Sequence, residues 1–201
     1  MSTLVTFGLD GRAGGVRAAG AATALGQSER MLHAELTVDA PVKEVWNAWT
    51  TAEGIATFFA PAGHVDLRVD GTYDVWFFPK AEPGLRGAEG MRILDVDPMR
   101  RFVFTWNAPP TFPTVRDRRT VVVLELEELA PARTRFRFTQ MGWGEGADWD
   151  KVYAYFDRAW GAVVLPRMVH RFANGPIDWD SPPELEPVAP TLQQTLAEWR
   201  P

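Results

Sequence analysis

Two ionisable side chains, Glu145 and His64, are candidates for proton transfer. Glu145 lies between Gly144 and Gly146 in a turn that precedes a helix, and His64 follows Gly63 at the start of a strand. Desolvation at the mouth of an apolar cavity moves the pKa of a carboxyl or imidazole group toward neutrality, which suits acid–base catalysis. The alternative for each residue is an ordinary surface position, solvated or hydrogen-bonded.

A second acidic pair, Asp148 and Asp150, has a position that favours a structural role. Asp148 is predicted to be the N-cap of a long helix. Asp150 then falls in the first turn, where a carboxylate stabilises the positive end of the helix dipole. We therefore interpret this pair as capping residues and not as catalytic acids.

Several classes of site are excluded by the residues that the chain lacks. The chain contains no Cys, so it has no disulfide and no thiolate-bound metal. Its three histidines are far apart, and we expect no metal site. No Gly-x-Ser-x-Gly motif is present, which excludes a serine-hydrolase elbow. The glycines from Gly142 to Gly146 lack the spacing of a dinucleotide fingerprint, so we expect no cofactor.

The charge balance argues against polyanionic partners. Lys and Arg total 21 against 26 Asp and Glu, a net charge of −5 over 201 residues. No Lys/Arg-rich run is present, so we expect neither nucleic acid nor an anionic membrane as a partner. The small residues of 18–26 follow Arg12 and Arg17 without a Leu-rich core, which favours a flexible N-terminal extension over residues 1–29 and not an export signal. We therefore predict a cytoplasmic protein.

The residues after the Gly-rich turn form an aromatic stripe. Trp149, Tyr153, Phe156 and Trp160 recur at three- and four-residue spacing, which places them on one face of a helix. So broad a stripe needs a large concave partner. Its rings could be core that packs against a sheet, or walls of a ligand pocket, and both roles can hold around one helix.

Alternation of apolar and polar residues predicts seven strands. They are Met31–Asp39, Val65–Val69, Tyr73–Phe78, Met91–Val96, Phe102–Trp106, Thr120–Glu128 and Arg133–Gln140. Their inward faces carry Phe136 and Phe138 together with the polar groups of Tyr73, Trp106 and Gln140. Polar groups are costly to bury unpaired, so these either pair internally or orient a ligand.

Helical spacing predicts two short helices and one long one. The short helices follow the first strand, one after Pro41 and the second over Ile55–Phe59. The long helix runs from about Asp148 toward Phe172, and Pro166 bends or interrupts it. Residues 174–201 are rich in proline and are predicted to be a tail, with a short helix over Thr191–Trp199. Short connections between the strands indicate an antiparallel α+β fold.

These elements and motifs resemble the START-like superfamily of helix-grip proteins, in the branch named after the activator of the heat-shock-protein ATPase. The resemblance covers about residues 30–172 and rests on Ala40–Trp46, Ala48–Thr51, Phe58–Pro61, Val69–Gly71, Met91–Leu94, Phe104–Trp106 and Gly142–Gly144. It implies a helix-grip domain over 30–173, in which a seven-stranded antiparallel sheet curls around a long C-terminal helix beside an apolar cavity. Functions vary widely within one fold.

We hypothesise that the chain binds a small hydrophobic ligand in this cavity. The candidate lining residues are Tyr73, Trp106, Phe136, Phe138, Gln140, Trp149, Tyr153, Phe156 and Trp160. One alternative is an enzyme of the hydrolase, cyclase or hydratase type that uses Glu145 or His64. A third hypothesis is a co-chaperone-like ATPase activator, although nothing in the chain supplies the additional chaperone-binding domain of the proteins that give the branch its name. A homodimer is compatible with all three.

Overall fold

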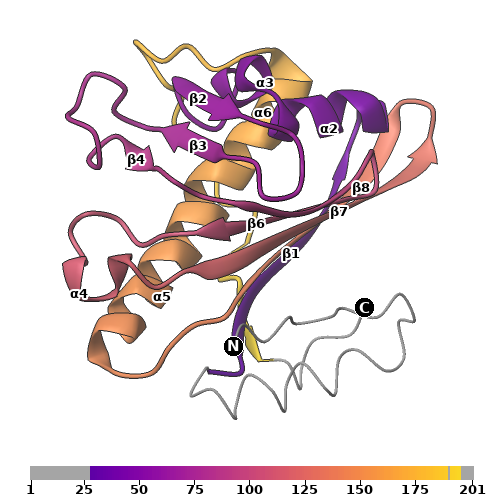
Figure 1. The fold of residues 1–201 in the computed structure, drawn as a ribbon. Coiled ribbons are helices and arrows are strands. Elements are labelled where there is room, and N and C mark those ends of the chain that lie inside the picture. Colours follow the sequence, from indigo (N-terminus) through magenta and orange to yellow (C-terminus); the bar gives the residue numbers. More distant parts are fainter. Residues whose placement is uncertain (1–27, 190, 196–201) are drawn as a thin grey trace.

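The computed structural model describes residues 28–189 and 191–195, which form two antiparallel sheets and a long helix (Figure 1). The large sheet has the strand order β5, β6, β7, β8, β1 and β9, with bounds Ile93–Asp97, Arg101–Trp106, Thr120–Ala130, Arg133–Met141, Arg30–Val38 and Gln193–Thr195. The small sheet has the order β2, β3 and β4, with bounds Ala62–Val65, Tyr73–Trp76 and Gly87–Ala88. The predicted antiparallel α+β fold with a long C-terminal helix is confirmed. The extension predicted for residues 1–29 lies outside the described residues, except for Ser28 and Glu29.

The number of strands differs from the prediction, because the described residues form six strands in one sheet and three in the other. The strand predicted over Val65–Val69 ends at Val65, where a tight loop begins. In that loop Arg68 N donates to Asp66 O at 2.7 Å, and Asp70 takes a φ of 63°. A left-handed residue and a local turn remove this segment from the sheet.

Strands β7 and β8 keep the predicted alternation. Leu124 pairs with Phe138 and Leu126 pairs with Phe136 across β7 and β8, and all four side chains are buried. The opposite face is charged, and there Arg137 Nε donates to Glu35 at 2.7 Å. One apolar and one solvated face give the sheet a single register, because a shift by one residue would expose the rings.

Helices α2 (Val42–Thr50) and α3 (Ala52–Ala56) cover one end of the large sheet (Figure 1). Thr51 caps α3, because its hydroxyl accepts a hydrogen bond from Gly54 N at 2.9 Å. A Cβ atom at Gly54 would lie 2.1 Å from Asn47 O, so the two helices approach each other as closely as glycine permits.

The long C-terminal helix consists of α5 (Ala147–Ala159), a π-helical turn (Trp160–Val164) and α6 (Leu165–Asn174). Pro166 does not end the helix. Because proline has no N–H, the carbonyl of Gly161 lacks a helical donor, and it accepts a hydrogen bond from Val188 N at 3.0 Å. The predicted irregularity at the proline therefore takes the form of a widened turn just before it.

The prediction that Asp148 caps this helix is wrong. The N-cap is Gly146, whose φ of 106° suits glycine alone, and no side chain caps the first turn. Asp148 instead accepts a hydrogen bond from Thr114 Oγ1 at 2.7 Å, which ties α5 to helix α4 (Pro113–Arg116). This hydrogen bond holds the pKa of Asp148 below its ordinary value. Asp150, in the first turn as predicted, pairs with Arg30 at 2.7 Å.

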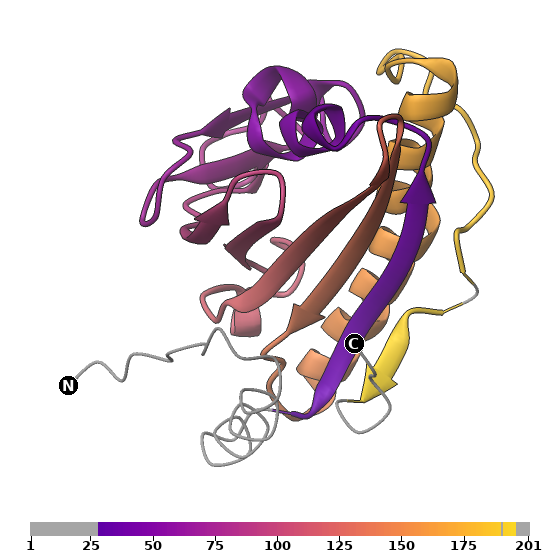
Figure 2. The ribbon, with the colours of Figure 1, turned by 90° about the vertical axis from the view of Figure 1, so that its right-hand side faces the viewer.

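Residues 176–189 and 191–195, here named the C-terminal strap, run along the outside of the long helix to the edge of the sheet (Figure 2). The strap begins at α3, where the indole Nε1 of Trp179 donates to Ala56 O at 2.7 Å. It ends at β1, where His33 N donates to Leu192 O at 3.1 Å. Between these points, Gly161 allows the strap to approach the helix, since a Cβ there would lie 3.3 Å from Leu192 Cγ.

Asp157 fastens the end of the strap to helix α5. Its carboxylate accepts hydrogen bonds from Leu192 N at 2.6 Å, Thr191 Oγ1 at 3.0 Å and Gln193 Nε2 at 3.1 Å. The chain is thereby directed onto β1 and forms β9 over Gln193–Thr195. The short helix predicted here is wrong over those residues, because pairing with an open sheet edge overrides local helix propensity. The rest of that predicted helix, 196–199, lies outside the described residues.

Candidate functional site

The side chains expected to line a ligand site come from two elements that face each other. On the helix, Trp149, Tyr153, Phe156 and Trp160 are each at most 5% exposed. The sheet contributes the remaining candidates, which are also buried, namely Tyr73, Trp106, Phe136, Phe138 and Gln140. All of these residues join one continuous core, here named the grip interior.

Aromatic rings fill the middle of the grip interior. The Trp160 ring centroid lies 4.6 Å from that of Phe138, 5.6 Å from Trp106 and 5.6 Å from Phe59. Such spacings are typical of favourable ring–ring contacts. In this conformation the rings occupy the space that the sequence assigned to a cavity, so a ligand has to displace some of them.

Gln140 is the centre of a buried hydrogen-bond network. Its Nε2 donates to Thr120 Oγ1 at 2.8 Å, and its Oε1 accepts from Trp160 Nε1 at 2.7 Å. Its backbone oxygen accepts from Trp143 Nε1 at 3.2 Å, while Thr120 Oγ1 donates to Trp106 O at 3.2 Å. Both polar atoms of the amide that could orient a ligand therefore already bond to the protein itself.

The two buried tyrosine hydroxyls also bond to the protein. Tyr73 donates to Trp49 O at 2.9 Å, and Tyr153 donates to Met31 O at 2.8 Å. Complete burial raises the pKa of Tyr73, so this phenol stays protonated and acts as a donor. Neither hydroxyl needs a ligand to satisfy it.

The end of the grip interior beside α4 is different. The indole Nε1 of Trp149 is buried and has no hydrogen-bond partner. Asn107, at the end of β6, is 5% exposed, and its side chain makes no hydrogen bond within the described ranges. Gly144 lies against the indole, since a Cβ there would be 2.2 Å from Nε1. Trp149, Asn107, Gly144 and helix α4 together are named the α4 end.

The two proton-transfer candidates are not brought together. Glu145 lies in the loop before α5, at the α4 end, and His64 lies on β2 beside α3. These elements occupy opposite ends of the molecule (Figure 1). Both side chains are exposed. They cannot form one acid–base pair, so only one of them could serve any single site.

The sequence analysis missed two residues near these candidates. Asp74 stands opposite His64 in the β2–β3 pair, and burial raises its pKa although Gly90 N donates to its carboxylate at 2.7 Å. Trp143 is fully buried, with its ring 4.9 Å from that of Tyr153. A two-residue turn at Asp70–Gly71 would pair Asp74 with Leu67 and not with His64, so the sequence did not predict the first pairing. Nothing in the Gly-Trp-Gly sequence signals that the Trp143 ring turns inward.

The comparison with protein families gives a match over the same region. The model described as Activator of Hsp90 ATPase homolog 1-like protein matches residues 39–172, about two thirds of the chain. The chain belongs to this family. The matched residues include all of the grip-interior candidates and both proton-transfer candidates.

Solved structures with the same fold support this membership. The Aha1 dimer from Colwellia psychrerythraea has a TM-score of 0.55 at 18% identity, over 72% of this chain and 97% of that chain. An Hsp90 activator from Plasmodium falciparum has a TM-score of 0.50 at 16% identity, over 67% and 91%. A conserved protein of unknown function from Enterococcus faecalis has a TM-score of 0.56 at 18% identity, over 80% and 82%. These likenesses confirm the START-like helix-grip fold. A comparison with curated proteins found no match.

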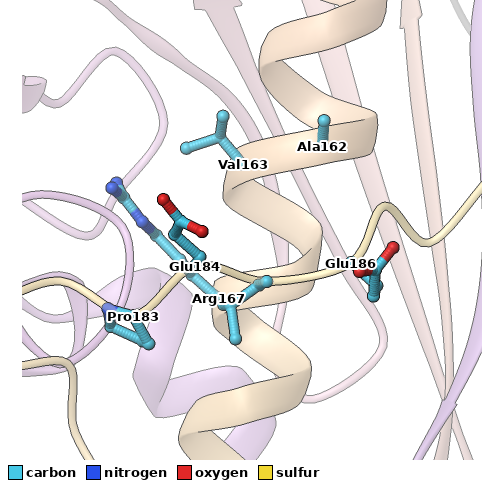
Figure 3. A pocket seen from close by; sticks show the side chains of 7 residues that line it. Ala162, Val163, Arg167, Pro183, Glu184 and Glu186 are labelled. Carbon is cyan, nitrogen blue, oxygen red and sulfur yellow. The ribbon is translucent and has the colours of Figure 1, made fainter.

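The C-terminal strap lies beyond the residues that match the Hsp90 activator family. Between the strap and the long helix are two surface hollows, of about 390 and 330 Å³. The residues that line the larger hollow are Ala162, Val163, Arg167, Pro183, Glu184, Leu185 and Glu186 (Figure 3). This larger hollow is distinct from the grip interior, because its walls come from the outer face of the long helix and from the strap.

The described residues contain no group of three or more His, Asp or Glu side chains arranged to hold a metal ion. Nor does any helix in these ranges combine the length and apolar content that a bilayer crossing requires.

Proposed function

We propose that this member of the Hsp90 activator homolog family binds a small, largely apolar molecule between the sheet and the C-terminal helix, at the α4 end. The observation that carries the proposal is the buried Nε1 of Trp149, which has no partner. An unpaired buried donor costs about 1–3 kcal/mol. A ligand that places a carbonyl or ether oxygen on this donor recovers that energy, and the surrounding rings suit an apolar body.

Few contacts join helix α4 directly to α5, which supports admission of a ligand between these two helices. Helix α4 touches α5 through the exposed hydrogen bond from Thr114 to Asp148 and through the rings of Phe112 and Tyr155, whose centroids are 5.9 Å apart. Tyr155 is 45% exposed. Contacts of this kind belong to the less stable part of a fold.

Opening requires that α4 move away from α5 and that Val115, which is buried in the same core, leave its place. Arg116 keeps α4 bonded to β4 and the loop before it, because its guanidinium donates to Gly84 O at 2.8 Å and to Gly87 O at 3.1 Å.

The π-helical turn supports the same proposal. It begins at Trp160, whose ring lies in the middle of the grip interior and whose indole bonds to Gln140. Turns of this kind occur frequently at functional sites. They widen the helix locally, so a small change at this turn would shift the Trp160 ring against its neighbours.

The first test is to look for the ligand itself. Native mass spectrometry of the full chain purified from its own host should show a co-purifying small molecule, released on denaturation. In parallel, an apolar fluorescent probe should bind saturably at about one site. A probe that never saturates, together with a protein that carries no bound molecule, would contradict the proposal.

The enzyme hypothesis is kept for Glu145 alone among the two candidates, because only Glu145 lies at the α4 end. If this protein turns over a ligand, the Glu145→Gln variant should lose activity while His64→Gln retains it. A chelator should leave turnover unchanged. Equal turnover by the unmodified protein and both variants would show that neither residue takes part in catalysis. Loss of turnover when the chelator is added would point to a metal.

Stimulation of an Hsp90 ATPase is a second candidate function, and the family match favours it. We expect no stimulation by this chain, because it is acidic, with a net charge of −5. ATP turnover by a purified Hsp90 with increasing amounts of the protein is the measurement. A dose-dependent rise would place this function above ligand binding.

We also propose a homodimer in the cytoplasm. The relative from Colwellia psychrerythraea is described as a dimer, which supports the first part. A composition ordinary for a globular protein, with 46% hydrophobic and 23% charged residues, is compatible with the second. Light scattering after size-exclusion chromatography tests the assembly, and cell fractionation tests the location.

A further inference from the structure

Arg167 carries a charge that the described protein leaves unpaired. It lines the hollow of about 390 Å³ and is half-buried. Its guanidinium carbon lies 5.3 Å from the centroid of the Trp179 ring. Within residues 28–189 and 191–195, no hydrogen bond or ion pair engages its nitrogens. Burial lowers the pKa of Arg167, as expected for a cation without a compensating acceptor.

The opposite wall of the hollow is acidic. Figure 3 shows the guanidinium of Arg167 and the carboxylate of Glu184 directed toward the same space, beside Val163, with Glu186 farther along the strap. The remaining wall is apolar and includes Leu185. The hollow therefore presents one cation, two carboxylates and an aliphatic surface.

The acidic wall is held less firmly than the rest of the strap. Trp179 is bonded to Ala56, and Val188 is bonded to Gly161. Between them, residues 182–187 make no hydrogen bond to any described residue. A segment fixed at both ends and free in the middle can close over a small molecule without any change to the fold.

We propose that this hollow binds a small apolar amino acid in its zwitterionic form, with the carboxylate on Arg167 and the ammonium on Glu184. A guanidinium matches a carboxylate in shape and charge. The two glutamates disfavour a dianion such as phosphate, and they supply acceptors for an ammonium group. Val163 and Leu185 accommodate an aliphatic side chain. Because its walls come from the strap and from the outer face of the helix, this site is additional to the grip interior.

The test is isothermal titration of the full chain with four probes. They are L-leucine, 4-methylpentanoate, which lacks the ammonium, 3-methylbutylamine, which lacks the carboxylate, and inorganic phosphate. Leucine should bind, and each of the other three should bind at least about tenfold more weakly, because each loses one charged hydrogen-bonded contact. Phosphate that binds as well as leucine would contradict the proposal, as would no detectable leucine binding up to its solubility limit.

Variants assign the site. Arg167→Gln should weaken leucine binding by about tenfold or more. Arg167→Lys should weaken leucine binding less, because lysine keeps the positive charge and loses only the two parallel N–H donors of the guanidinium. Glu184→Gln should also weaken it. The matched control is Arg158→Gln, since Arg158 is exposed on the same helix and does not line the hollow. Leucine affinity that is unchanged in a folded Arg167→Lys or Arg167→Gln protein would overturn the assignment.

Discussion

Each end of the grip interior buries a tryptophan, but only one of these two indoles has a hydrogen-bond partner. On α2, Trp49 Nε1 donates to Met168 Sδ at 3.2 Å, and its ring stacks on Phe136 with centroids 5.4 Å apart. On α5, at the end beside α4, Trp149 Nε1 is buried with no partner. Trp49, Phe136 and Met168, with helix α2, are named the α2 end.

The difference separates stability from binding within one core. At the α2 end the Trp49 indole donates to Met168 Sδ and the Tyr73 hydroxyl donates to Trp49 O, so both of these buried donors are satisfied inside the protein and contribute to folding. At the α4 end a donor is left over, and a buried polar group without a partner is costly enough to require an explanation. We therefore assign stability to the α2 end and ligand recognition to the α4 end.

The largest effect should come from truncation at the α2 end. Trp49→Ala removes a 1% exposed ring that contacts several others, and it should lower the free energy of unfolding by about 3–5 kcal/mol. Urea denaturation followed by circular dichroism measures the loss. A loss no larger than that of a surface substitution would show that the two ends do not differ in packing.

The next effect concerns the network between the two ends. Gln140→Leu removes the acceptor of the Trp160 indole and should cost about 1–3 kcal/mol, because the indole N–H stays buried. The double variant with Trp160→Phe should cost less than the sum of the two single variants, since it removes donor and acceptor together. Additive costs would mean that this hydrogen bond does not couple the residues.

At the α4 end the effects on stability and binding should separate. Trp149→Phe keeps a ring and removes an unpaired donor, so the free energy of unfolding should change by less than about 1.5 kcal/mol. The affinity for a ligand with a carbonyl oxygen should nevertheless fall about fivefold to tenfold. The control is Trp179→Phe, on the C-terminal strap, which should leave that affinity unchanged. An equal fall in both variants would remove the distinction between the two ends.

The smallest effect concerns pH and arises outside the grip interior. Burial lowers the pKa of His33 on β1, whose ring lies 3.0 Å from Thr139 Oγ1. The unfolded chain then binds this proton more readily than the folded one. The contribution of neutral His33 to the free energy of unfolding is therefore complete above about pH 6.5, the ordinary pKa of histidine. It is lost as the pH falls through the lower pKa that His33 has in the folded protein. His33→Gln should flatten the decline in melting temperature between about pH 7 and 5. The same decline in both proteins would contradict the assignment.

The sequence predicted the parts of the fold that periodicity controls. The alternation of β7 and β8 and the aromatic face of α5 were predictable because side chains repeat every two residues on a strand and every three or four on a helix. Glu145 was correctly expected beside the start of α5, because the glycines around it require a turn there. These features depend on neighbours in the chain.

Features that depend on distant contacts were not predictable in the same way. Aspartate is a common N-cap residue, yet the carboxylate of Asp148 accepts its hydrogen bond from Thr114 on another helix. Gln193–Thr195 pairs with β1 because Asp157 directs the chain there. The partner of Gln140 and the lack of one for Trp149 follow from how the rings pack. A one-dimensional pattern identifies which residues are buried but not which of their polar atoms are satisfied.

The Trp149 indole can be observed directly. The chain has 9 tryptophans, and each indole N–H gives one signal in a ¹H–¹⁵N spectrum of protein labelled at tryptophan. Trp149→Phe identifies the signal of interest by its disappearance. Titration with 2-nonanone, whose carbonyl can accept a hydrogen bond, should move the Trp149 signal saturably and more than that of Trp49. Nonane, which has no acceptor, should not reproduce this shift. A Trp149 signal that stays in place throughout the 2-nonanone titration would contradict the assignment of recognition to the α4 end.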